Sequence, residues 1–340
     1  MKKSLIVLAL AGVSLALGST PSHAAQGSGP LRPVQTIALP NVSGRIDHFT
    51  ADVRDRRLFI SALGNHTVEV VDMARDKWMR SLPGVQKPQG ECYVVPLGKL
   101  FTADGAAGNV RVYRGSDLRL LTTVPLDLGP DAEDYDPTTR RLYVGYGGED
   151  AGKSYGELGI IDAVSDKHIG DIRIAAHPGA ILVGRPGRTI YITVPKTQEI
   201  SQIDASTGRI DATWKSKEGS PVSLAFDASG DRLFVGTRKP AEVEVFDASS
   251  HRWIGSLPSV GLMDGLFYDA AHRRIYASGG DGEVAVYQQL SADRYQQLAS
   301  VPTGPNARTS LWVARLSRYF VAVPAGAGRR AELLDFEPSP

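Results

Sequence analysis

A short strand-like motif recurs seven times along this chain at a nearly constant spacing. Each copy places an aromatic residue directly after Leu, Ile or Tyr, as in Arg57-Leu58-Phe59-Ile60 and Arg232-Leu233-Phe234-Val235. A repeat of roughly 40 to 50 residues is typical of one four-stranded blade of a β-propeller. The sequence therefore predicts seven blades. The aromatic residues are 42, 42, 48, 43, 42 and 44 residues apart, at Phe59, Phe101, Tyr143, Tyr191, Phe234, Tyr276 and Phe320.

A run of alternating apolar and polar residues follows most copies of the motif and usually ends in Asp. Residues 68–72, 158–162 and 243–247 are examples. Period-two alternation indicates a β-strand, and no part of the repeat region shows a sustained helical period. A parallel sheet with crossover helices is therefore excluded. We predict an all-β fold, a seven-bladed propeller of four-stranded antiparallel blades.

The two ends of the repeat region complement each other. Residues 34–39 form an unassigned strand before the first copy, and the last copy stops after residues 331–336 without an outer strand. If the N-terminal strand completes the C-terminal blade, the ring closes and an exposed sheet edge is paired. We therefore predict one propeller domain over residues 34–337.

The N-terminus has the pattern of an export signal. Lys2 and Lys3 precede an apolar run over residues 5–17, and small residues lead up to Ala24. The run is too short to span a bilayer, and no other stretch is long enough. We predict a signal peptide over residues 1–24, a flexible lead-in over residues 25–33, and a periplasmic or secreted protein without a membrane span.

Composition removes several classes of partner and site. The chain has 340 residues, with 38 Lys and Arg against 37 Asp and Glu, so no net charge draws it to nucleic acid. Its single cysteine can form neither an internal disulfide nor a Cys-rich zinc site. We expect a monomer that binds a small molecule, a carbohydrate-like ligand or a partner protein.

The loops that lead into the innermost strands converge around the propeller axis, where ligand sites collect. Aligning the copies there, with a shorter turn in the second copy, places Asp47, Glu91, Asp131 and Asp264 at equivalent positions. Crowded carboxylates repel each other unless a cation, an arginine or protonation relieves them. The other candidate site residues near these entrances are Arg45, His48, Glu133, His177 and Arg308.

Three interpretations of this acidic opening stay open. The carboxylates can hold a divalent metal, with Ca²⁺ or a transition metal recruited by the histidines as alternatives. They can serve acid and base chemistry on a sugar or lactone. They can also form a structural ring of ion pairs with the arginines, which is the commonest outcome for such networks. The metal ligands would come from Asp47, Glu91, Asp131, Glu133 and Asp264.

Two recurrent features are interpreted as structural. Asp52, Asp136, Asp227 and Asp269 stand before the inner hairpins, where a short carboxylate closes a turn on the backbone. Residues 152–156 spell G-x-S-x-G, but they lie in a Gly-rich insertion between two strands of the third copy. A nucleophile elbow needs a strand that turns into a helix, so we predict no serine hydrolase site there.

The motif resembles that of the YVTN-repeat β-propellers, particularly the exported YncE-like proteins of bacteria. Residues 58–65 and 191–195, each followed by Val-x-Val-like strands, carry this resemblance, and residues 44–49 are similar to a segment typical of one subgroup. The resemblance covers residues 34–337 and implies the propeller fold and export. It does not specify chemistry, because propellers host binding proteins and enzymes alike.

Two functional classes follow. The first is a binding or interaction scaffold that uses the central funnel. The second is a metal-assisted or acid/base enzyme of the lactonase, glycosidase or lyase type, with His48, His177, Glu133 and Arg308 as candidate catalytic residues. The first is favoured because spacing alone assigns no complete ligand set or catalytic triad.

Overall fold

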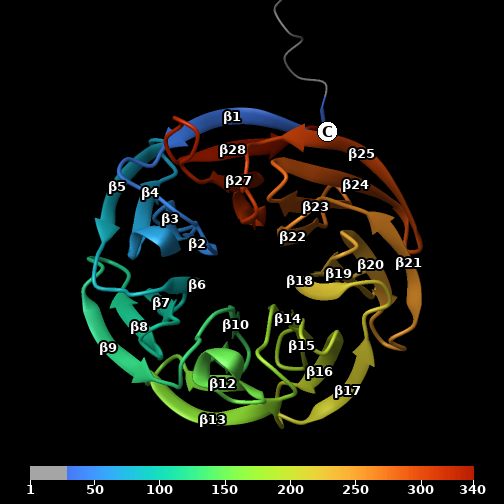
Figure 1. The fold of residues 1–340 in the computed structure, drawn as a ribbon, viewed down its shortest axis with the longest axis horizontal. Coiled ribbons are helices and arrows are strands. Elements are labelled where there is room, and N and C mark those ends of the chain that lie inside the picture. The colour runs from blue at the N-terminus through green and yellow to red at the C-terminus, as the bar shows by residue number, and fades with distance from the viewer. Residues whose placement is uncertain (1–28) are drawn as a thin grey trace, which may run out of the picture.

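The computed structural model describes residues 29–340, and seven four-stranded antiparallel sheets surround one central axis (Figure 1). The predicted seven-bladed propeller is confirmed. The signal peptide predicted over residues 1–24 and the first part of the lead-in lie outside the described residues. The helices of the described chain are short 3₁₀ turns, and none is long and apolar enough to cross a membrane.

The strands follow each other from the axis outward in every blade. Blades 1 and 2 contain β2 (Phe49–Asp52), β3 (Arg57–Ala62), β4 (Thr67–Asp72), β5 (Lys77–Leu82) and β6 (Pro88–Val94), β7 (Lys99–Asp104), β8 (Asn109–Arg114), β9 (Leu120–Pro125). Blades 3 and 4 contain β10 (Glu133–Asp136), β11 (Arg141–Gly147), β12 (Gly156–Asp162), β13 (Lys167–Ile174) and β14 (Ile181–Arg185), β15 (Thr189–Val194), β16 (Glu199–Asp204), β17 (Ile210–Lys215). Blades 5 and 6 contain β18 (Ser220–Asp227), β19 (Arg232–Arg238), β20 (Glu242–Asp247), β21 (Trp253–Pro258) and β22 (Met263–Asp269), β23 (Arg274–Gly279), β24 (Glu283–Ser291), β25 (Arg294–Pro302). Blade 7 contains β26 (Ser310–Val313), β27 (Arg318–Val323), β28 (Glu332–Pro338) and β1 (Leu31–Ala38), and the 3₁₀ turns are η1 (Leu63–Asn65), η2 (Gly148–Ala151) and η3 (Ala314–Leu316).

The N-terminal strand closes the ring as predicted. β1 pairs antiparallel with β28 and brings Ile37 opposite Leu333. The strand begins earlier than expected, so residues 31–33 belong to the sheet and the prediction that they form a flexible lead-in is wrong. The reason is that Leu31 is buried in the core and Arg32 forms an ion pair with the opposite strand.

The repeated motif supplies the core of each blade. Its seven aromatic residues lie on the second strands and are at most 3% exposed. The turn prediction is also confirmed, because the carboxylates before the inner hairpins accept backbone N–H bonds of 2.8 to 3.1 Å from residues two positions later, at Asp52, Asp136, Asp227 and Asp269. Residues 152–155 form a loop between η2 and β12, without the strand-to-helix turn of a nucleophile elbow.

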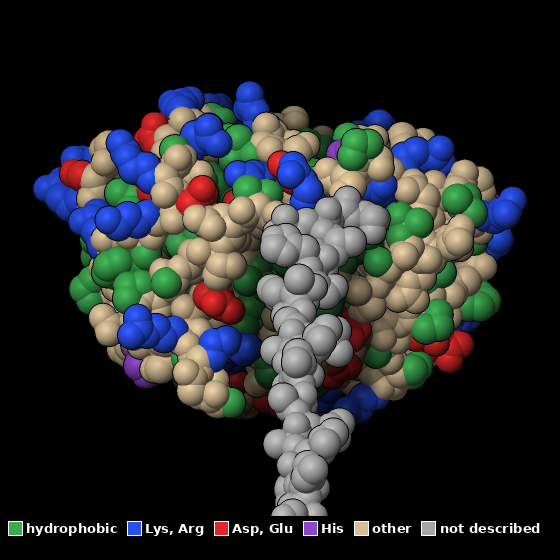
Figure 2. Space-filling view, turned by 90° about the horizontal axis from the view of Figure 1, so that it is seen from above, with side chains coloured by type: hydrophobic (Ala, Val, Ile, Leu, Met, Phe, Trp, Pro, Cys, Tyr) green, Lys and Arg blue, Asp and Glu red, His purple; other side chains and the backbone are tan. Residues whose placement is uncertain are grey.

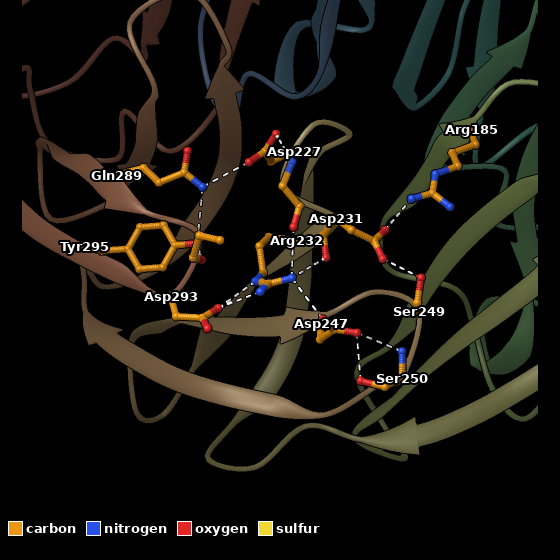
Figure 3. A network of polar contacts seen from close by, with 12 residues as sticks. Arg185, Asp227, Asp231, Arg232, Asp247, Ser249, Ser250, Gln289, Asp293 and Tyr295 are labelled. Carbon is orange, nitrogen blue, oxygen red and sulfur yellow. Dashed lines mark hydrogen bonds and ion pairs between the residues drawn. The ribbon is translucent and has the colours of Figure 1, made fainter.

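A network of polar contacts joins blades 5 and 6 away from the axis (Figure 3). The guanidinium of Arg232 on β19 lies 3.0 Å from Asp247 and 2.7 Å from Asp293, which precedes β25. The side chain of Gln289 on β24 donates a 2.9 Å hydrogen bond to Asp227 on β18. These charges satisfy each other, so this network stabilises the contact between two blades.

The outer wall carries charges of both signs. Figure 2 shows Lys and Arg side chains along both rims of the face in view, with Asp and Glu among them and hydrophobic side chains scattered between. Exposed apolar side chains on the outermost strands include Met79, Ile169 and Trp253. Each lies on a different blade, so these three side chains do not form a common apolar patch and are ordinary surface residues.

Candidate functional site

A cavity of about 890 Å³ lies on the propeller axis. Its walls come from the innermost strands of the blades and from the loops that precede these strands. Cavities of roughly 300 to 1,000 Å³ that combine apolar walls with a few polar groups are typical small-molecule sites. The candidate residues identified from the sequence line this cavity, apart from Asp47, which lies behind its wall: Arg45, His48, Glu91, Asp131, Glu133, His177, Asp264 and Arg308.

Three of the four predicted acidic positions are equivalent in the structure. The backbone N–H of Asp47 and that of Asp131 donate to carbonyl oxygens of the neighbouring second strand, at 2.7 and 2.9 Å. The pairing of Leu266 with Ala277 puts Asp264 at the same level in blade 6. Blade 7 has Arg308 at this level. These equivalent positions of the blades therefore carry three carboxylates and one guanidinium.

The prediction that Glu91 belongs to this ring is wrong. Glu91 lies opposite Thr102, which directly follows the motif aromatic, and Glu133 lies opposite Val144, which occupies the same place in blade 3. The two glutamates are thus equivalent to each other and lie two residues deeper along their strands. Both lie ten residues before the motif aromatic of their blade, whereas the three aspartates lie twelve residues before theirs. The shorter turn expected in blade 2 is therefore absent, and Gln89 stands at the spacing of the aspartates.

Two of the ring carboxylates are neutralised by arginines. Arg45 Nη2 lies 2.9 Å from Asp47 and 3.8 Å from Asp264. Arg238, at the end of β19, lies 2.8 Å from the other oxygen of Asp264 and donates to the carbonyl of Met263. The predicted ring of ion pairs is present in this part of the cavity.

Arg238 was not identified from the sequence, although a signal for it existed. It is the last residue of β19, the second strand of blade 5, and follows the motif aromatic Phe234 by four residues. A survey of residues that end second strands would have found it. Its pairing with Asp264 crosses from blade 5 to blade 6, which no single repeat reveals.

His48 and Asp47 form an acid and base pair at the edge of the cavity. His48 Nε2 lies 3.7 Å from Asp47, whose side chain is fully buried, whereas the His48 side chain is 39% exposed. Loss of hydration raises the pKa of Asp47 to about 6, opposed by His48 and Arg45. Loss of hydration lowers the pKa of His48, but Asp47, Asp264 and Asp131 outweigh it, so the net pKa of His48 is raised. The pKa of each group therefore depends on the protonation state of the other.

His177 does not serve as a free base. Its Nδ1 lies 2.7 Å from the carbonyl oxygen of Pro178, and its Nε2 lies 2.9 Å from that of Gly129. Both ring nitrogens are engaged with backbone, which leaves neither for a metal or a substrate. The ring therefore orders the loop that leads into blade 4.

Glu91 is buried and fully hydrogen-bonded. Ser61 and Thr102 each donate a hydroxyl to one of its carboxyl oxygens, both at 2.8 Å. Burial nevertheless raises the pKa of Glu91 to about 8, and these two hydrogen bonds only partly oppose the shift. The buried environment therefore favours the protonated form of Glu91.

Glu133 lacks the hydroxyl partners that Glu91 has. The positions of Ser61 and Thr102 are occupied by Ala103 and Val144 around Glu133, so both of its buried carboxyl oxygens have no hydrogen-bond partner among residues 29–340. Burial, together with Glu91 and Asp131, raises the pKa of Glu133 well above its usual range. Close packing holds this side chain, because a Cβ on Gly90 would lie 2.9 Å from Glu133 Cγ.

The insertion in blade 3 overhangs the cavity. Glu149 and Asp150 of η2 line it, and they form ion pairs with Lys196 of blade 4 and Lys87 of blade 2. Lys153, just beyond η2, pairs with Asp127 at 2.9 Å. The insertion is thus fixed to the blades on both sides of it.

The metal interpretation gains no support from this geometry. Within residues 29–340, no group of three or more His, Cys, Asp or Glu side chains is arranged to hold a metal ion. The physical reason is that arginines already lie against Asp47 and Asp264, while Glu91 is turned into a blade interface by its two hydroxyl partners.

The fold and its axial cavity define a seven-bladed β-propeller. Three solved structures share it: hydrazine synthase of Kuenenia stuttgartiensis, a chain of the mitotic checkpoint complex, and the WD40 repeats of RRP9. Their TM-scores are 0.69, 0.77 and 0.73, at 15%, 11% and 10% sequence identity. The matches cover 83%, 99% and 93% of this chain and 94%, 99% and 99% of those chains. At such identities the likeness is one of fold alone. No model of a known protein family matches the chain, and no curated protein matches it in sequence.

Proposed function

We propose that this protein is an exported YVTN-repeat propeller, similar to the YncE-like proteins, that binds a small polar ligand in its axial cavity. The observation that carries the proposal is the cavity of about 890 Å³, which charged and apolar side chains line together. The repeated motif and the segment over residues 44–49 support the family, and the N-terminal pattern of Lys2, Lys3 and the apolar run supports export.

The scaffold suits binding for a physical reason. Backbone hydrogen bonds within rigid blades fix the residues around the cavity, so little conformational freedom is lost when a ligand enters. A partner protein on the face of the ring is the other form of the scaffold hypothesis. The axial cavity favours a small molecule, because its polar groups converge inward rather than onto a flat face.

The test compares the protein with a variant whose cavity is filled. Val222 lines the cavity and lies at a bulge in β18, so Val222→Trp projects an indole into the open space. Val164→Trp is the matched control, because Val164 is 47% exposed in an outer turn. Purified proteins are incubated with a polar cell extract, and retained compounds are identified by mass spectrometry.

We expect the wild type and Val164→Trp to retain a compound in stoichiometric amount, and Val222→Trp to lose it. Retention of no compound, or equal retention by all three proteins, would refute the proposal. Circular dichroism and the melting temperature establish that both variants are folded.

Glu133 favours a second candidate, an acid/base enzyme without a metal. A carboxylic acid that stays protonated at neutral pH can donate its proton to the leaving oxygen of a glycoside or lactone. The unpartnered carboxyl of Glu133 suits this role, and the His48–Asp47 pair offers a base in the same cavity. Glu133→Gln would lower turnover of an active glycoside or lactone at least 100-fold while leaving its binding intact. Turnover unchanged in this variant would exclude Glu133 as the acid.

A further inference from the structure

Charge pairing around the axial cavity leaves two ions without partners. The basic residues Lys87, Lys153 and Lys196 form ion pairs with the insertion of blade 3 or its surroundings. The arginines Arg45 and Arg238 hold Asp47 and Asp264. These pairs account for five of the cationic side chains at the cavity.

The other buried acids of the wall are engaged by the protein or shielded by it. Asp134 accepts backbone N–H bonds from Val183 and Tyr135, and Glu91 accepts the hydroxyls of Ser61 and Thr102. Burial raises the pKa of Glu133 well above its usual range, which disfavours its charged form. What is left is Asp131 and Arg308. Within residues 29–340, neither of these side chains forms a hydrogen bond or an ion pair, and both line the cavity.

The two unpaired ions lie at the same level on nearly opposite sides of the axis. Asp131 precedes β10 of blade 3, and Arg308 precedes β26 of blade 7, so blades 1 and 2 separate them on one side and three blades on the other. Figure 1 shows β10 and β27 facing each other across the central opening. A ligand that meets both must carry opposite charges at its two ends.

Both positions are held rigidly by the backbone. The carbonyl oxygen of Arg308 accepts bonds from the Ser278 hydroxyl at 2.8 Å and the Gly265 N–H at 3.0 Å. The N–H of Asp131 donates to Gly145 at 2.9 Å. Fixed anchors with free charged groups are the arrangement that gives a charged ligand orientation as well as affinity.

We propose that the cavity takes a zwitterion, with Asp131 binding its ammonium group and Arg308 its carboxylate. The guanidinium matches a carboxylate with two parallel hydrogen bonds. Because the anchors lie across the axis, the two charged ends of the ligand must be well separated, and we take a short peptide with free termini as its class, since an extended tripeptide spans about 10 Å. This inference rests on the proposed binding function and specifies its ligand class.

Isothermal titration with four forms of trialanine tests the inference: the free peptide, its N-acetyl form, its C-terminal amide and the doubly blocked form. We expect the free peptide to bind, and blocking either end to weaken binding about tenfold or more. We expect Arg308→Gln to bind the free peptide and its C-terminal amide with equal affinity. We expect Asp131→Asn to bind the free peptide and its N-acetyl form with equal affinity. Arg209→Gln and Asp211→Asn, which change exposed charges at the outermost strand of blade 4, are the matched controls and leave the wild-type pattern unchanged.

Equal affinity for the free and doubly blocked peptides, or affinities that Arg308→Gln and Asp131→Asn do not alter, would overturn the zwitterion inference. The inference would also be overturned if the wild type bound no peptide but still retained another compound that Val222→Trp loses. In these cases the binding function stands and only its ligand class is wrong. If the wild type retains no compound, or if Val222→Trp retains it equally, the binding function itself fails.

Discussion

Replacing Glu91 by Gln tests whether a neutral carboxylic acid lies buried between blades 1 and 2. The folded protein raises the pKa of Glu91 from 4.5 to about 8, because burial penalises the charged form. Stability contributed by the protonated side chain is therefore complete below pH 4.5 and is lost as the pH rises through 8. The amide of Gln has no such titration, and Ser61 and Thr102 can still bond to it.

The magnitude follows from the size of the shift. Each pKa unit corresponds to 1.36 kcal/mol, so the wild type should lose about 3 kcal/mol relative to Glu91→Gln between pH 5 and pH 8. For a domain of this size, that difference corresponds to roughly 5 °C in melting temperature. Other groups titrate equally in both proteins, so the difference between the two profiles isolates Glu91.

Urea denaturation at half-unit pH steps measures the effect, supported by calorimetry. Glu218→Gln is the matched control, because Glu218 is exposed, and its profile should follow that of the wild type. Parallel profiles for the wild type and Glu91→Gln would refute the reasoning. They would mean that water reaches this carboxyl and keeps its pKa near that of the unfolded chain.

Three further predictions concern the ends, the blade contacts and the cavity wall. Protein secreted by a bacterial host should begin at Ala25 by mass spectrometry, and a retained Met1 would contradict the export signal. Arg232→Met should lower the free energy of unfolding by about 2 to 4 kcal/mol, because it leaves the carboxylates of the blade 5 and 6 network unpaired. A loss no larger than that of the exposed Arg209→Met would contradict this. Gly90→Ala should lower the melting temperature by several degrees, because the new Cβ would lie 2.0 Å from the Asp131 carbonyl oxygen. An unchanged melting temperature would show that the wall yields without strain.

Periodicity allowed most of the fold to be predicted. The aromatic spacing and the two incomplete ends determine the number of blades and the closure, because each repeat buries its core only against its neighbours. The acidic level formed by Asp47, Asp131 and Asp264 was predictable for the same reason, since equivalent positions in a ring face one axis.

The remainder of the site depends on contacts between repeats. The position of Glu91 is an exception, because counting back from the motif aromatic places Gln89, and not Glu91, at the spacing of the aspartates. The pairing of Arg238 with Asp264 joins two blades. Glu133 lacks hydrogen-bond donors because Ala103 of blade 2 and Val144 of its own blade replace the hydroxyl residues that surround Glu91. Such relations arise only once the blades are packed.

Ring closure has a consequence for how the molecule is made. The partner of Leu31 is Pro338, so the first strand synthesised pairs with the last one. At about 5 to 20 residues per second, a ribosome needs roughly 15 to 60 s to make the intervening chain. Throughout that time a nascent chain presents an unpaired strand edge, which is a template for association with other chains. Closure of the ring is therefore a late step, because β1 can complete its sheet only after β28 has been made.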